Sequence, residues 1–181
     1  VKMNGRRETG HEWGTNPCSE IILRPYQFCN LTEVVVREHD DLESLRRKVR
    51  LATILGTAQS TFTKMPYLRK IWQKNTEEER LLGVSLTGIM DNNILSKTVD
   101  SPRWLQELKA QAIDVNRIYA DKLGVPASAA ITCVKPSGTV SQLTDTASGI
   151  HARHSAYYIR TVRGDNKDPL TQFMKDSGIP A

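Results

Sequence analysis

Three side chains with chemical potential lie on alternate residues of one short segment: the amide of Asn16, the thiol of Cys18 and the carboxylate of Glu20. Pro17 fixes its own φ angle and favours an extended conformation at Asn16, so we expect a bent, exposed loop rather than a helix. Side chains alternate along extended chain, so these three are expected to point to the same side. One ligand could then contact all three groups.

A second candidate site is the segment 135–141, which reads Lys-Pro-Ser-Gly-Thr-Val-Ser and lies between an expected strand and an expected helix. Small residues let backbone N–H groups approach an anion, and a helix N-terminus adds a favourable dipole. The segment lacks the Gly-Lys-Ser/Thr ending of a Walker loop. We predict a different phosphate-binding turn here, with an ordinary strand-to-helix turn as the alternative. Its candidate ligands are Lys135, Ser137, Gly138, Thr139 and Ser141.

Two further cysteines accompany Cys18. Cys29 follows it by eleven residues, too far for a Cys-x-x-Cys redox pair, but the two thiols can face each other if the chain reverses at Arg24-Pro25. A small buried apolar residue is the alternative for each. Cys133 lies in an apolar stretch, and we expect it to be such a buried residue. Three cysteines are an odd and sparse set, which argues against a disulfide scaffold and for a reducing compartment.

His151 and His154 have a spacing that could serve a metal, but no companion cysteine or acidic ligand is placed to complete a site, so no metal is predicted. The composition is that of a soluble globular domain, with 181 residues, 39% hydrophobic and 25% charged. No apolar run is long enough to span a membrane, and a cytoplasmic protein is the expectation. The absence of an initial methionine and the Ser-Gly-Ile-Pro-Ala ending favour a fragment of a longer chain.

The net charge of +5 permits an anionic partner such as a nucleotide, DNA or RNA. The densest basic group, at 46–50, follows the acidic residues of 40–43 on one expected helix. A solvated helix face is therefore the favoured interpretation, and direct nucleic-acid binding is not expected.

The pattern of apolar residues predicts strands separated by helices. Strands are expected at 31–36, 81–89, 129–134 and 157–162; helices at 41–62, 67–72, 102–123, from 139 and 169–176; and a solvated connection at 77–80. The run at 81–89 is nearly continuous and suits a strand buried on both faces. Alternating strands and helices imply parallel pairing through crossover helices, hence an α/β sheet or barrel.

Five motifs, in order, resemble the large catalytic subunit of ribonucleotide reductase, most closely the adenosylcobalamin-dependent (class II) triphosphate reductases. They are Asn-Pro-Cys-Ser-Glu at 16–20, Cys-Asn-Leu at 29–31, Gly-Val-Ser-Leu-Thr-Gly-Ile-Met-Asp at 83–91, the turn at 135–141, and Tyr-Tyr-Ile-Arg at 157–160. The resemblance implies a ten-stranded α/β barrel of two parallel five-stranded halves with a finger loop through its centre. The chain, 1–181, would be one partial catalytic domain covering the finger loop, about 14–30, and roughly the second half of the barrel.

The resemblance also implies roles. Cys18 would carry a thiyl radical that removes the 3′ hydrogen of a ribose, Glu20 would take the 3′ hydroxyl proton, and Asn16 would hold the ribose hydroxyls. Cys29 would be one of two cysteines that reduce the 2′ position and close to a disulfide. The turn at 135–141 would hold the phosphates.

The implied partners are a ribonucleotide, adenosylcobalamin, an external dithiol reductant such as thioredoxin, and the remainder of the reductase chain. The second reducing cysteine, the C-terminal cysteine pair and most of any allosteric site would lie outside 1–181. The isolated chain is therefore expected to be inactive. The alternative is a non-catalytic nucleotide-binding module derived from the same barrel.

Overall fold

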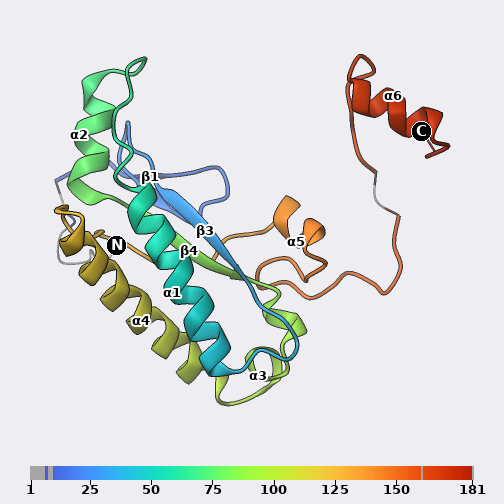
Figure 1. Ribbon diagram of the computed structural model, residues 1–181, viewed down its shortest axis with the longest axis horizontal. Helices are drawn as coiled ribbons and strands as arrows, with labels where there is room; N and C mark the ends of the chain where they lie inside the picture. The colour runs from blue at the N-terminus through green and yellow to red at the C-terminus, as the bar shows by residue number, and fades with distance from the viewer. Residues whose placement is uncertain (1–6, 8–9, 160, 181) are drawn as a thin grey trace.

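The computed structural model describes residue 7 and residues 10–159 and 161–180. The strands lie in the first half of the chain, and every element after β4 is helical (Figure 1). In chain order they are β1 (Gly14–Thr15), β2 (Ile22–Leu23), β3 (Asn30–Val35), α1 (Leu42–Gln59), α2 (Lys70–Glu79), β4 (Leu82–Thr87), the 3₁₀ turn η1 (Ile89–Asp91), α3 (Asn93–Lys97), α4 (Ser101–Lys122), α5 (Thr139–Leu143) and α6 (Pro169–Asp176).

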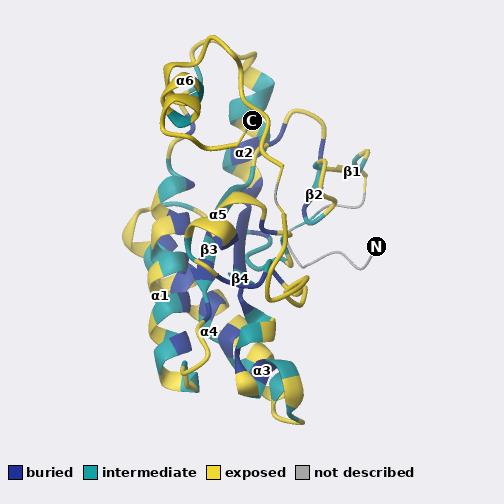
Figure 2. Ribbon diagram, turned by 90° about the vertical axis from the view of Figure 1, so that its right-hand side faces the viewer, coloured by how far each residue is buried: buried dark blue, intermediate teal, exposed yellow. Residues whose placement is uncertain are grey.

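The centre of the fold is a parallel pair of strands. β3 and β4 pair in register from Asn30 opposite Leu82 to Val35 opposite Thr87, and α1 and α2 form the crossover between them. α1 and α4 pack together and cover one face of this pair (Figures 1 and 2). The apolar core lies between these layers and contains Val34, Val36, Leu45, Val49, Val84, Leu95, Leu108 and Ala112. The predicted α/β class with parallel strands is therefore confirmed.

Local sequence signals explain the two long helices. Asp41 caps α1, where its side chain accepts a hydrogen bond from the backbone of Ser44 and satisfies a free N–H group of the first turn. α4 has proline in its first turn and is followed by Gly124 at a φ of +65°, a left-handed position that favours glycine. Both helices end within a few residues of their predicted bounds.

The segment 129–134 lies beside β4 but forms less regular structure than predicted. Leu82 N donates to Ala130 O at 3.0 Å, Val84 N donates to Ile131 O at 2.8 Å, and one parallel bridge joins Val84 to Thr132. The last backbone hydrogen bond to β4 comes from Cys133 N, which donates to Val84 O at 3.1 Å. The segment delivers Lys135 to the edge where the finger loop lies.

Two other predictions were wrong. The run 77–80 is not a solvated connection, because it forms the end of α2, with Glu79 and Arg80 only 3% and 9% exposed. The segment 157–162 forms no strand in its described residues, and Tyr157 and Ile159 are almost fully exposed, because no strand edge lies beside them within the described residues. Residue 160 lies outside the described residues. α6 follows this segment and buries no residue (Figure 2).

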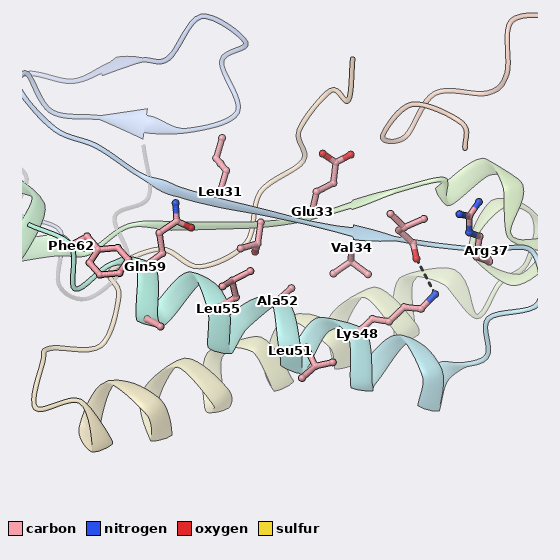
Figure 3. Close-up of a pocket in the computed structure, with 13 residues that line it drawn as sticks. Leu31, Glu33, Val34, Arg37, Lys48, Leu51, Ala52, Leu55, Gln59 and Phe62 are labelled. Atoms are coloured by element: carbon pink, nitrogen blue, oxygen red, sulfur yellow. Dashed lines mark hydrogen bonds between the residues drawn. The ribbon is translucent and has the colours of Figure 1, made fainter. Parts of the chain in front are cut away.

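One edge of β3 is open in the described part of the chain. β3 pairs with β4 alone, and a groove of about 1010 Å³ runs between its other edge and α1 (Figure 3). Lys48 reaches from α1 to the carbonyl of Val35 at one end of this groove. The α1 side of the groove carries three exposed apolar side chains, those of Leu51, Leu55 and Phe62.

No helix in the described residues is both long enough and apolar enough to cross a membrane.

Candidate active site

The finger loop contains a tight turn centred on its cysteine. Ser19 N donates to Asn16 O at 2.9 Å, and Ser19 has a φ of +62°. The Asn16 side chain accepts from Ile21 N at 3.0 Å and closes the turn, which β1 and β2 flank as an antiparallel pair. The expectation that the side chains of residues 16, 18 and 20 point to the same side of an extended segment was wrong, because Ser19 has a left-handed backbone conformation. Cys18 is exposed at the turn, whereas the Glu20 side chain is fully buried.

The buried carboxylate of Glu20 pairs with a lysine that is distant from it in the sequence. Lys135 Nζ donates to Glu20 Oε1 at 3.0 Å across a sequence separation of 115 residues. The Lys135 side chain is 26% exposed and that of Glu20 is 0% exposed. Glu20 Oε2 is also buried but has no hydrogen-bond partner among the described residues. The structure thus joins the two predicted sites through one ion pair, which the sequence pattern did not indicate.

This pairing fixes the charge of both groups. Burial alone would raise the pKa of Glu20. Hydrogen bonds from its own backbone N–H, from Lys135 and, to a smaller extent, from Asn16 outweigh burial, so the pKa of Glu20 lies below its ordinary value. The hydrogen bond to Glu20 raises the pKa of Lys135. Glu20 is therefore an ionised carboxylate with a cation on one oxygen at neutral pH.

The other two thiols lie behind the loop. Cys29 precedes β3 and Cys133 lies in the segment beside β4, and both pack against the apolar cluster that contains Ile21. Burial and then the charge of Glu20 raise the pKa of Cys29, and the same two causes raise the pKa of Cys133 to about 12. Both are free, half-buried thiols that stay protonated at neutral pH.

A buried polar network holds the base of the finger loop. Glu79 accepts hydrogen bonds from Arg7 at 2.9 and 3.0 Å and from Gln27 at 2.5 Å, and Arg24 Nε lies 3.7 Å from it. Arg24 also pairs with Glu78 at 2.9 Å. These contacts attach both ends of the hairpin to α2. Sequence reasoning missed the network, since Glu79 lies in a run of three glutamates that carries no signal of burial.

The predicted phosphate turn forms a compact structure at the start of α5. Ser137 is buried and accepts from Ser141 N through its hydroxyl at 3.1 Å, and the fully buried Ser141 hydroxyl donates to Ser137 O at 2.8 Å. Gly138 and Thr139 are exposed at the surface of this turn. Gly149 packs closely against the turn. It has a φ of +55°, and a Cβ at this position would lie 2.7 Å from Lys135 O.

The remaining sequence candidates lie apart from this centre. His151 and His154 are exposed, with His151 Nδ1 3.2 Å from Ser148 O. Within the described residues, no group of three histidine, cysteine or acidic side chains is arranged to hold a metal ion. Tyr158, from the motif at 157–160, donates to the side chain of Gln142 on α5 at 2.8 Å.

Comparison with known proteins identifies the class that these features define. No family model matches the chain. The solved structure of a B12-dependent (class II) ribonucleotide reductase superposes with a TM-score of 0.72 at 26% identity, covering 93% of this chain and 26% of that chain. The fold of this chain is thus similar to that of a segment of a class II ribonucleotide reductase.

The sequence relatives narrow the likeness within that class. The chain is 32% identical over 193 aligned positions to the adenosylcobalamin-dependent ribonucleoside-triphosphate reductase of Lactobacillus acidophilus, covering 91% of this chain and 25% of the relative. It is 29% identical over 190 positions to the enzyme of the same description from Lactobacillus leichmannii, with the same coverage. The chain spans about a quarter of the length of these curated relatives. The resemblance drawn from the five motifs is confirmed.

Proposed function

We propose that this chain is the finger-loop segment of a ribonucleotide reductase that converts ribonucleotides to deoxyribonucleotides by thiyl-radical chemistry. One observation carries the proposal: an exposed thiol, Cys18, lies two residues from a buried, ionised carboxylate, Glu20, and that carboxylate is paired with the first residue of the phosphate turn. A nucleotide held at the turn by its phosphates presents its ribose to the loop. The sequence relatives, all reductases by description, favour this function over a non-catalytic nucleotide-binding module.

The domain is proposed to be part of a ten-stranded barrel completed by the remainder of the reductase chain. The open edge of β3 supports this, since an unpaired parallel strand exposes backbone donors and acceptors that another strand would satisfy. The exposed Leu51, Leu55 and Phe62 beside that edge give the added element an apolar surface to cover.

Cys18 and Glu20 are proposed to act together on the ribose. The hydrogen atom on C3′ moves to the Cys18 sulfur, while the proton of the 3′ hydroxyl moves to the carboxylate of Glu20. Asn16 accepts from Ile21 N through its amide oxygen. Its NH₂ group has two hydrogens: one bonds to Glu20, and the other is proposed to donate to a ribose hydroxyl. The exposed position of Cys18 allows a radical generator to reach its sulfur.

Cys29 is proposed to supply reducing equivalents to the 2′ position. Its raised pKa keeps it as a thiol, so it brings both an electron and the proton that the departing 2′ hydroxyl needs to leave as water. A second cysteine, from the remainder of the chain, supplies the other electron and proton, and the two sulfurs close to a disulfide. An external dithiol such as thioredoxin then returns both to thiols by exchange.

The phosphate groups are proposed to bind at the surface of the turn at 135–141. Gly138 and Thr139 are exposed residues, so their backbone N–H groups and the Thr139 hydroxyl are proposed as the phosphate donors. Ser137 and Ser141 bond to each other and shape the turn from behind.

Adenosylcobalamin is the cofactor proposed for the whole enzyme. The described residues are compatible with this cofactor, because the thiol of Cys18 is free and exposed and can lose a hydrogen atom to it. When bound, the cofactor supplies the one-electron chemistry that converts this thiol to a thiyl radical. The residues that hold it are assigned to the remainder of the chain.

The test is a turnover assay on the full-length reductase that contains this segment. Ribonucleoside triphosphate, adenosylcobalamin and a dithiol are supplied together and then each is omitted, and deoxynucleotide is measured by chromatography. Product that requires all three is the expected result. Nucleotide binding without any product under the complete mixture would support the binding-module alternative and overturn the proposal.

A further inference from the structure

We propose that Lys135 is a positioning residue for Glu20 rather than a phosphate ligand: it holds Oε1 of the carboxylate and leaves Oε2 as the atom that accepts the substrate proton. This inference rests on the proposed function, because it assigns the proton acceptor of that same reaction. It separates Lys135 from the other residues of the phosphate turn.

The two carboxylate oxygens of Glu20 differ in their hydrogen bonding, and an ion pair with only a structural role does not require this difference. Oε1 accepts from Lys135 Nζ at 3.0 Å, whereas Oε2 is buried without a partner among the described residues. A buried acceptor without a hydrogen bond is costly and rare in native proteins, so each one calls for an explanation. A ligand hydroxyl that donates to Oε2 removes that cost. The carboxylate of Glu20 is thus held with Oε2 available to accept a hydrogen bond from a substrate hydroxyl.

The direction of the Lys135 side chain supports the same assignment. Lys135 is the first residue of the turn, but its ammonium group donates to Glu20 of the finger loop at 3.0 Å. A lysine committed to a fully buried carboxylate would have to abandon that carboxylate in order to bind phosphate. Leaving Glu20 buried and charged without its cation is strongly unfavourable.

Lys135 is the charged neighbour that keeps the carboxylate of Glu20 ionised. Among the described residues, the groups that face the carboxylate are the ammonium of Lys135, the thiols of Cys29 and Cys133, the amide of Asn16 and the backbone N–H of Glu20 itself. Both thiols have raised pKa values and are neutral at physiological pH. Removal of the lysine charge therefore raises the pKa of Glu20, so a higher pH is needed to keep the carboxylate ionised.

The experiment measures the pH dependence of kcat/KM and the KM for ribonucleotide in the full-length reductase with Lys135→Met and Lys135→Arg. For Lys135→Met we expect the acid limb of kcat/KM to move to higher pH, so that the loss of activity is greatest at acidic pH, with KM changed less than twofold. Lys135→Arg should restore the limb towards its wild-type position because it keeps the ion pair. An unmoved limb in Lys135→Met, with KM raised severalfold, would identify a phosphate ligand and overturn the inference.

Two further results keep the inference separate from the proposed function. If the wild-type reductase forms no deoxynucleotide, the proposed function fails; if it does and the limb in Lys135→Met does not move, this inference alone fails. Should Lys135→Met not fold, Lys135→Gln tests the same point, because it keeps a donor but removes the charge, and its limb should also move to higher pH. A Lys135→Arg limb that coincides with that of the neutral variants would contradict the inference as well.

Discussion

Gln27 donates from Nε2 to Glu79 Oε2 at 2.5 Å, and this hydrogen bond ties the base of the finger loop to the last turn of α2. The backbone carbonyl of Glu79 also accepts from Ala129 N at 2.8 Å, at the start of the segment that leads to Lys135. One residue therefore fixes both the loop that carries Glu20 and the segment that carries its lysine. The relative placement of the two halves of the site depends on Glu79, whose carboxylate binds the loop and whose backbone carbonyl binds the segment before Lys135.

Glu79→Gln is expected to destabilise the full-length reductase by roughly 3–5 kcal/mol, because the buried Arg7 loses its anion and Arg24 keeps only its ion pair with the half-exposed Glu78. Burial raises the pKa of Glu79, but hydrogen bonds from Arg7 and Gln27 outweigh it and hold the pKa below its ordinary value. A depressed carboxylate pKa contributes stability above the unfolded-state pKa, and that stability is lost as the pH falls through the folded-state pKa. Thermal melting at several acidic pH values measures this loss.

The matched control is Glu78→Gln on the same helix. Glu78 pairs with Arg24 but its side chain is 45% exposed, so the change should cost no more than about 1 kcal/mol. Equal melting temperatures for the two variants across the acidic range would show that the buried network is not what holds the loop.

Gly149→Ala is expected to cost more than Gly124→Ala, although both glycines have positive φ. At Gly124 a Cβ meets nothing within 4 Å, so only the left-handed strain of roughly 1–2 kcal/mol applies. At Gly149 the Cβ would lie 2.7 Å from Lys135 O, and the resulting backbone shift should add roughly 1–3 kcal/mol. Melting temperature and turnover of both full-length variants check this, and a lower melting temperature for Gly124→Ala would refute it.

Leu55→Asp is expected to destabilise the full-length reductase by roughly 1.5–3 kcal/mol, the value of burying a leucine side chain. Leu55 is 62% exposed in this chain, so the cost arises only if the remainder of the barrel covers the groove beside β3. Val99→Asp, at a residue that is 97% exposed outside the groove, is the control and should be nearly neutral. Denaturant unfolding measures both changes. A Leu55→Asp protein as stable as the wild type would mean that the groove remains open.

The three thiols are expected to react with an alkylating reagent in a fixed order at neutral pH. Cys18 is exposed and should react first, whereas Cys133, with a pKa of about 12 raised by burial and by Glu20, should react last. Peptide mass spectrometry after timed labelling of the folded protein gives the order. Labelling of Cys133 as fast as Cys18 would show that Cys133 is not shielded as the structure describes.

Much of the fold follows from local signals. The buried run at 82–87, the Asp41 cap and the glycine at 124 each act through neighbours in sequence, and the elements that they specify form as predicted. The strand expected at 157–162 does not form in its described residues, because strand formation needs a neighbouring edge. Local sequence contains no information on whether such an edge is present.

The sequence indicates candidate site residues but not how they are arranged. The motifs marked Cys18, Glu20 and Lys135, yet the Glu20–Lys135 pair spans 115 residues and depends on how two segments pack. The turn at 19 replaced the expected extended chain because the Asn16 side chain and backbone offered closer hydrogen-bond partners. The charges of Glu79 and Arg80 concealed the burial of these two residues, because a charged residue is buried only when partners from elsewhere pair with it.

The central claim is that Cys18 carries the radical, and the most direct measurement is deoxynucleotide formation by full-length Cys18→Ser, with Cys133→Ser as the matched control. A serine hydroxyl does not take the place of a thiol in radical transfer, so Cys18→Ser should form no product while it binds ribonucleotide with unchanged affinity. Cys133→Ser should keep most of its turnover. Deoxynucleotide formed by Cys18→Ser at a rate comparable to the wild type would contradict the account.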